Sequence, residues 1–87
     1  MASTPKDRFA NFVTSKGRRV TEQMSRVVDM ALEHSGTFCH DDVLAALEGK
    51  ASRATVYRTL AKMVEADVLR QVKFNGREVF VVTAAGS

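Results

Sequence analysis

The sequence predicts an α+β fold, mostly helical, in which three or four helices are followed by a two-stranded β-hairpin in one domain of 87 residues. Apolar residues recur at helical spacing up to residue 64, and the period changes from about 3.6 to about 2 after Asp67. The dipeptide Asn75-Gly76 then separates two β-rich segments, which is a strong signal for a type I′ turn. Together these observations indicate a winged helix-turn-helix, with the hairpin as the wing.

Four helices are expected, over residues 5–15, 22–35, 40–48 and 53–67. The first, second and fourth begin after good N-cap residues, which are Thr4, Thr21 and Ser52. The second is expected to end at Ser35-Gly36, where glycine can take the left-handed conformation. A short third helix, a tight turn and a longer fourth helix form the helix-turn-helix.

The fourth helix has one apolar stripe, formed by Val56, Leu60, Met63 and Val64. We expect this stripe to be buried. Thr55, Arg58 and Lys62 must then face away from the core, with Tyr57 on the flank. The polar side of this helix is therefore available for a partner.

The wing is predicted over residues 69–74 and 77–82. A two-residue loop places Lys73 opposite Glu78 and Val72 opposite Val79, which pairs charge with charge and apolar with apolar. In this register Glu78 shares a face with Phe80.

Charge is segregated along the chain, whose formal net charge is +3. Residues 1–26 carry six Lys/Arg against two acids, residues 27–49 none against five, and residues 50–87 seven against three. If the first and last segments meet in space, they form a basic surface suited to a polyanion, with the acidic segment turned elsewhere. Solvated helix faces are the alternative interpretation.

The fourth helix carries most of the side chains expected to contact double-stranded DNA. Arg58 can donate a fork of hydrogen bonds to guanine or phosphate, and Tyr57 can offer its ring to a thymine methyl group. Hydroxyls at the helix start can bond phosphate oxygens, and further cations add charge. The predicted contacts on this helix are Ser52, Arg53, Thr55, Tyr57, Arg58 and Lys62. An exposed helix face without a ligand is the alternative.

Two further basic segments are candidates for contact with DNA. Lys16, Arg18 and Arg19 precede the second helix, where they suit a phosphate backbone or the negative potential of a narrow minor groove. Lys73 and Arg77 stand at the tip of the wing and can touch phosphates. A solubilising loop and a commonly charged hairpin tip are the respective alternatives.

Other function classes find little support in the sequence. The close group His34, Cys39, His40, Asp41 and Asp42 has no recognised ligand spacing, so no metal site and no cofactor is expected. No nucleophile–base pair or phosphate-binding loop indicates an enzyme. The start MASTPKDRF has no apolar signal region, no run is long enough to span a membrane, and a single cysteine fits a reducing cytoplasm.

The runs GRRVTEQMSRVVDMALEHSGTF, HDDVLAAL and SRATVYRTLAKMVEADVLRQVKFNGREVFVV resemble the N-terminal DNA-binding domain of the ferric uptake regulator (Fur) family over about residues 9–82. The most specific part is S-x-A-T-V-Y-R-x-L at residues 52–60. The resemblance implies a transcriptional regulator that binds AT-rich inverted repeats as a dimer. It also implies that Tyr57 and Arg58 contact the major groove and that Arg19 enters the minor groove.

The chain departs from the family pattern in several places. The resemblance places Thr37 and Val81 at two ligand positions of the regulatory metal site, and Met24 where many members have arginine. The histidine-rich hinge expected near Thr83 and the C-terminal dimerisation and zinc domain are not seen. We therefore expect a module that binds one half-site, with a homodimer requiring a surface or segment that the sequence does not identify.

Two other functions are kept as alternatives. A protein-interaction module would use the acidic middle segment and the apolar strand at residues 79–82, and its binding would resist salt, whereas DNA binding weakens steeply as salt rises. A small metal sensor would take up zinc or iron tightly, which calorimetry on the isolated chain would detect.

Overall fold

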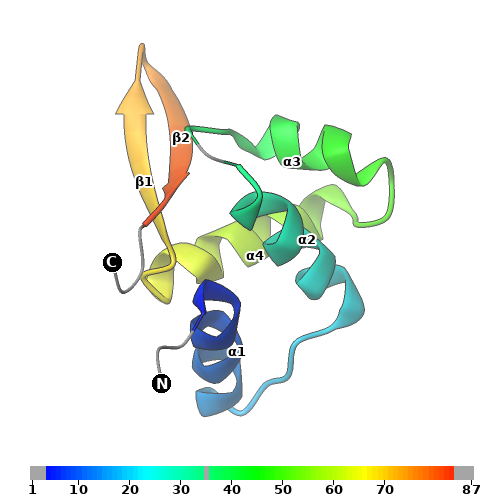
Figure 1. Ribbon diagram of the computed structural model, residues 1–87. Coiled ribbons are helices and arrows are strands. Elements are labelled where there is room, and N and C mark those ends of the chain that lie inside the picture. The colour runs from blue at the N-terminus through cyan, green and yellow to red at the C-terminus, as the bar shows by residue number, and fades with distance from the viewer. Residues whose placement is uncertain (1–3, 35, 84–87) are drawn as a thin grey trace.

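The computed structural model describes residues 4–34 and 36–83. The elements in chain order are α1 (Pro5–Ser15), α2 (Glu22–Leu32), α3 (His40–Leu47), α4 (Arg53–Glu65), β1 (Leu69–Phe74) and β2 (Arg77–Val82). Figure 1 shows the hairpin at one side of the helices, with its tip pointing away from α1. Four helices followed by an antiparallel hairpin confirm the predicted winged helix-turn-helix.

The helices begin where the capping residues predict. The hydroxyls of Thr4, Thr21 and Ser52 each accept a hydrogen bond, at 3.1 Å, from the backbone N–H three residues further on. These bonds satisfy donors that the first turn of a helix leaves without a partner. At the start of α3 the Asp42 carboxylate accepts from the backbone N–H of Cys39 at 2.9 Å.

α1 ends at Ser15 as predicted, whereas α2, α3 and α4 end one to three residues before their predicted ends. α2 ends at Leu32, because the N–H groups of Glu33 and His34 bond to the carbonyls three residues before them and tighten the last turn. The predicted stop at Ser35-Gly36 therefore lies beyond the observed end of α2, and Ser35 lies outside the described residues. α3 and α4 stop before residues 48 and 67, where Glu48 and Asp67 are left-handed at φ of 50° and 64°.

The core is formed by side chains from all four helices and from both strands. Phe9, Val28, Val43, Leu60 and Phe80 are among its fully buried members. On α4 the predicted residues Val56, Leu60 and Met63 are buried, and Val64 packs against them in a partly buried position. Thr59 is also buried, which the apolar pattern did not reveal. α2 packs against α3 and α4, so the core lies behind the helix-turn-helix.

The hairpin has the predicted register, with Lys73 opposite Glu78 and Val72 opposite Val79. Asn75 and Gly76 have φ angles of 53° and 75°, as a type I′ turn requires. Glu78 is tolerated on the same face as Phe80 because it lies near the tip, where its carboxylate accepts from Gln71 Nε2 at 2.8 Å.

A short backbone contact ties the wing to the helix-turn-helix. Phe38, just before α3, pairs with Phe80 of β2, and the two N–H···O distances are 2.9 Å and 2.6 Å. Phe38 therefore acts as a fragment of a third strand. The wing cannot swing away from α3 without breaking both bonds.

Candidate nucleic-acid interface

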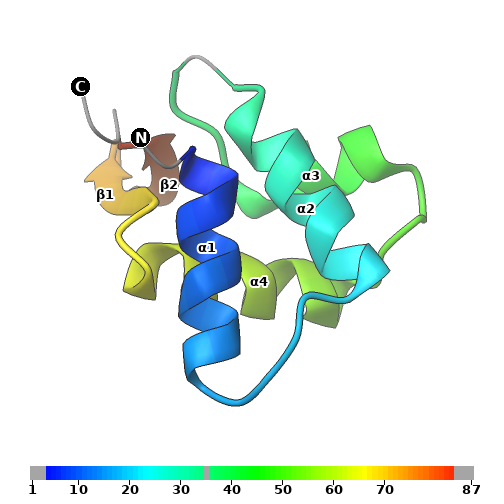
Figure 2. The same cartoon turned by 60° about the horizontal axis from the view of Figure 1, so that its bottom comes forward.

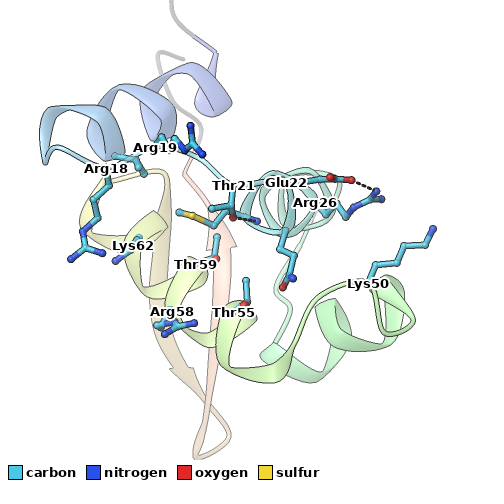
Figure 3. Close-up of a pocket in the computed structure, with 13 residues that line it drawn as sticks. Arg18, Arg19, Thr21, Glu22, Arg26, Lys50, Thr55, Arg58, Thr59 and Lys62 are labelled. Atoms are coloured by element: carbon cyan, nitrogen blue, oxygen red, sulfur yellow. Dashed lines mark hydrogen bonds and ion pairs between the residues drawn. The ribbon is translucent and has the colours of Figure 1, made fainter.

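An open groove of about 950 Å³ lies between the α1–α2 loop, the start of α2, the α3–α4 turn and the exposed side of α4 (Figure 3). Figure 2 shows how the loop of residues 16–21 leads from the end of α1 to the start of α2. We call this feature the basic groove, because one acid, Glu22, lines it together with six cations: Arg18, Arg19, Arg26, Lys50, Arg58 and Lys62.

The helical repeat of α4 explains which of its side chains reach the basic groove. Thr55, Arg58 and Lys62 lie three and four residues apart and so share one face of the helix. All three line the groove, opposite the stripe that is buried in the core. Thr59 lies on the same wall, although its side chain is buried. The polar face of α4 expected from periodicity thus forms one wall of the basic groove.

The loop and the turn place cations at both ends of the groove. In Figure 3, Arg18 from the α1–α2 loop and Lys50 from the α3–α4 turn lie far apart, with Thr55 and Arg58 between them. Thr21 and Glu22, at the start of α2, also line the groove. The positive end of the α2 dipole therefore adds to the field of the cations.

Few carboxylates neutralise these cations. In the described part of the chain, Arg26 Nη2 and Glu22 Oε2 form the one ion pair within the groove, at 2.7 Å. The other ion pairs lie elsewhere, such as Lys6 with Asp29 at 2.8 Å. Like charges held together without counter-charges produce a strong positive potential, which favours a polyanion.

The structure brings five of the predicted contact residues into the basic groove and leaves six outside it. Those inside are Arg18, Arg19, Thr55, Arg58 and Lys62. Those outside are Lys16, Ser52, Arg53, Tyr57, Lys73 and Arg77. The six residues outside the basic groove have local partners or lie on other surfaces.

Three of the outlying residues at the helix starts and in the loop are engaged locally. Lys16 Nζ lies 5.1 Å from the centre of the Phe12 ring, which is a cation–π distance. The Ser52 hydroxyl caps α4 and also donates to Thr55 Oγ1 at 2.9 Å. Arg53 lies 3.9 Å from Asp41 in an exposed ion pair, which is weak in solvent.

Tyr57 and the wing tip are exposed outside the basic groove. Tyr57 is 43 % exposed and stacks on the ring of His40, with the ring centres 3.9 Å apart. Lys73 and Arg77 flank the hairpin turn in exposed positions. Phe74, between them, is 62 % exposed, so the tip presents an aromatic ring as well as two cations.

A comparison with protein-family models gives one match. The model described as the ferric uptake regulator family matches residues 15–86. The chain belongs to the ferric uptake regulator (Fur) family. A search of curated proteins found no significant match.

Solved structures share the fold of this Fur-family chain. The peroxide-sensing regulator PerR from Streptococcus pyogenes superposes with a TM-score of 0.78 and 17 % identity, over 94 % of this chain and 59 % of that chain. The ferric uptake regulator from Pseudomonas aeruginosa, with manganese, gives 0.71 and 24 %, over 88 % and 61 %. That of Vibrio cholerae gives 0.68 and 19 %, over 88 % and 63 %. The chain thus spans about 60 % of the length of these relatives.

Family and fold together establish the general class of the protein. The chain is a Fur-family winged-helix DNA-binding domain. Within residues 4–34 and 36–83, no helix is long and apolar enough to cross a membrane.

The groove of this Fur-family domain includes polar residues that sequence reasoning missed. They are Thr21, Gln23, Arg26 and Lys50. Gln23 and Arg26 lie on α2, whose apolar spacing predicts only its core face, and Lys50 lies in the turn before the Ser52 cap. The sequence could have indicated Lys50 as a phosphate contact, because a cation just before the cap of the fourth helix lies near the phosphate-binding end of that helix. No sequence pattern indicates Arg26 as a groove residue, since its position depends on how α2 packs against α4.

The regulatory metal of the Fur family does not fit the residues of this domain. At the two positions that the resemblance assigns to ligands, Thr37 is exposed and offers only a hydroxyl, and Val81 offers only alkyl groups. In the parts of the chain that the structure describes, no three His, Cys, Asp or Glu side chains gather so as to hold a metal ion.

Proposed function

We propose that this domain is the DNA-reading part of a cytoplasmic transcriptional regulator and that it binds an AT-rich half-site. The observation that carries the proposal is the basic groove beside α4, with six cations against one carboxylate. α4 has 13 residues and is about 20 Å long, which suits insertion into a major groove about 12 Å wide. The loop before α2 and the wing then lie over the backbone or the adjacent minor groove.

The groove residues divide by the chemistry that each can provide. Arg58 has the planar fork that recognises guanine O6 and N7 or a phosphate, and it projects from the middle of α4. Lys62 and Lys50 provide point charges for phosphates. Arg19 is assigned to the minor groove, whose negative potential favours an inserted guanidinium. Tyr57 is assigned to a thymine methyl group or a phosphate at the edge of the site.

We assign binding of a full operator to a dimer. The related solved chains extend well beyond the part that this chain matches, so we place the dimer contact in a segment outside that matched part. One module on one half-site makes few contacts. We expect it to bind with a Kd toward the non-specific range of about 10⁻⁴ to 10⁻⁶ M at physiological salt.

The experiment compares Arg58→Ala with Arg8→Ala on AT-rich and GC-rich duplexes by fluorescence anisotropy. Both changes remove one positive charge, but Arg8 lies on α1 outside the groove, 3.9 Å from Asp67. Loss of a bidentate base contact costs about 1–3 kcal/mol, which is about 5- to 150-fold in Kd on the preferred duplex. Arg8→Ala should bind like the wild type. Equal affinity of Arg58→Ala and the wild type would remove α4 from the reading role.

A further inference from the structure

The first residue of α3, His40, lies between two aromatic rings that belong to different parts of the fold. On one side its ring stacks on Tyr57 of α4, with centres 3.9 Å apart and planes 16° from parallel. On the other side it meets the Phe80 ring of β2 nearly edge-on, with centres 4.9 Å apart and planes at 89°. Parallel stacking and T-shaped contact are both favourable aromatic geometries.

The Phe80 side of this arrangement is fixed to the core. Phe80 is 2 % exposed, and its backbone forms both hydrogen bonds of the Phe38 pairing. The rings of Phe38 and Phe80 are also in contact, with centres 5.8 Å apart. A continuous aromatic path therefore runs from the buried wing strand through His40 to the exposed Tyr57.

The Tyr57 side, in contrast, has little else to hold it. The Tyr57 ring is 43 % exposed, and within residues 4–34 and 36–83 His40 is its one aromatic neighbour. An exposed tyrosine on a helix can adopt two χ1 rotamers, and a DNA contact requires only one of them. A neighbour that selects the rotamer in the free protein removes part of the ordering cost of binding.

We infer that His40 is a positioning residue for Tyr57: stacked against Phe80, it holds the Tyr57 ring in the orientation that contacts DNA and couples the reading helix to the wing. This inference rests on the proposed function, because it takes Tyr57 to be a DNA contact. His40 itself acts through Tyr57, and the stacking requires a flat ring at position 40 rather than imidazole nitrogens.

A double-mutant cycle tests the coupling. Affinity for an AT-rich duplex is measured for the wild type, His40→Ala, Tyr57→Ala and the double variant, with thermal unfolding to show that each is folded. His40→Ala should weaken binding by about 2- to 10-fold, the range of a single aromatic pair. It should cause no further loss when Tyr57 is already alanine. His40→Phe, which keeps a flat ring, should restore binding to within about twofold of the wild type.

Two measurements separate failure of this inference from failure of the proposed function. In the Arg58→Ala background His40→Ala should still weaken binding, because Arg58 lies in the groove and not in the stack. The Tyr57 ring protons should carry an upfield ring-current shift in the NMR spectrum of the free protein, lost in His40→Ala and retained in His40→Phe. If His40→Ala lowers the affinity for DNA equally with Tyr57 present and with Tyr57 replaced by alanine, the inference is overturned while DNA binding stands. Tyr57 ring-proton shifts that are the same in His40→Ala as in the wild type would overturn it too. If neither Arg58→Ala nor Tyr57→Ala weakens binding, both proposals fail.

Discussion

The salt dependence of DNA binding can be calculated from the basic groove. Each phosphate neutralised on B-DNA releases counterions and contributes about −0.9 to the slope of log K against log salt. Six cations line the groove, but Arg26 is already paired with Glu22 at 2.7 Å. Five cations remain, and four of them can contact phosphates if Arg19 lies in the minor groove. Three can do so if Arg58 also contacts a base.

Three or four phosphate contacts correspond to a slope of about −2.7 to −3.6, or about a 40- to 150-fold loss of affinity between 50 and 200 mM salt. Lys62→Ala removes one groove cation and so tests whether these cations produce the salt dependence. It should reduce the slope by about 0.9 and weaken AT-rich and GC-rich duplexes equally. Fluorescence anisotropy with labelled duplexes over a series of salt concentrations measures both quantities.

The matched control is Lys6→Ala, because Lys6 lies on α1 outside the groove and pairs with Asp29 at 2.8 Å. This variant has the same net charge as Lys62→Ala and should keep the wild-type slope. A flat salt dependence of the wild type would instead favour the protein-interaction module, whose contact is mainly apolar. Equal changes of slope in both lysine variants would show that net charge, and not the groove, controls binding.

Three further predictions concern stability. Leu60→Ala, at a fully buried position of α4, should lower the free energy of unfolding by about 2–5 kcal/mol in urea titrations; a loss below about 1 kcal/mol would contradict the described core. Ser52→Ala should cost about 1 kcal/mol through loss of the cap on α4, whereas Ser52→Gly should cost a few tenths. Burial lowers the pKa of His40, against the raising effect of Asp41 and Glu78, so the folded state favours the neutral ring. Stability should therefore be complete above about pH 6.5 and decline below it. Calorimetric Tm should fall less between pH 7 and 5 in His40→Phe than in the wild type, and equal falls would refute this assignment.

Much of the fold could be predicted because its signals are local. The Thr21 cap acts on an N–H three residues away, and Asn75-Gly76 sets the hairpin register with no help from the rest of the chain. The ends of α3 and α4 were harder, because they depend on Glu48 and Asp67 in the left-handed conformation. Neither residue type marks such a position in a sequence, as glycine would.

The candidate site was only partly predictable for a related reason. Arg58 and Lys62 were found because they lie opposite the buried stripe of their own helix. Arg26 was missed because it joins the groove only when α2 packs against α4. The stack of His40 on Tyr57 joins residues on two helices, and no periodic pattern within either helix reports such a contact.

NMR mapping of a DNA complex tests the central claim most directly. Amide shifts of the ¹⁵N-labelled chain would be followed as an AT-rich duplex is added. The largest changes are predicted at residues 18–26 and 50–62, which surround the basic groove, with smaller changes at the wing tip. Little change is expected around the Lys6–Asp29 ion pair. Changes centred on that ion pair, or none at the groove at saturating DNA, would contradict the assignment of the groove and α4 as the DNA-binding face.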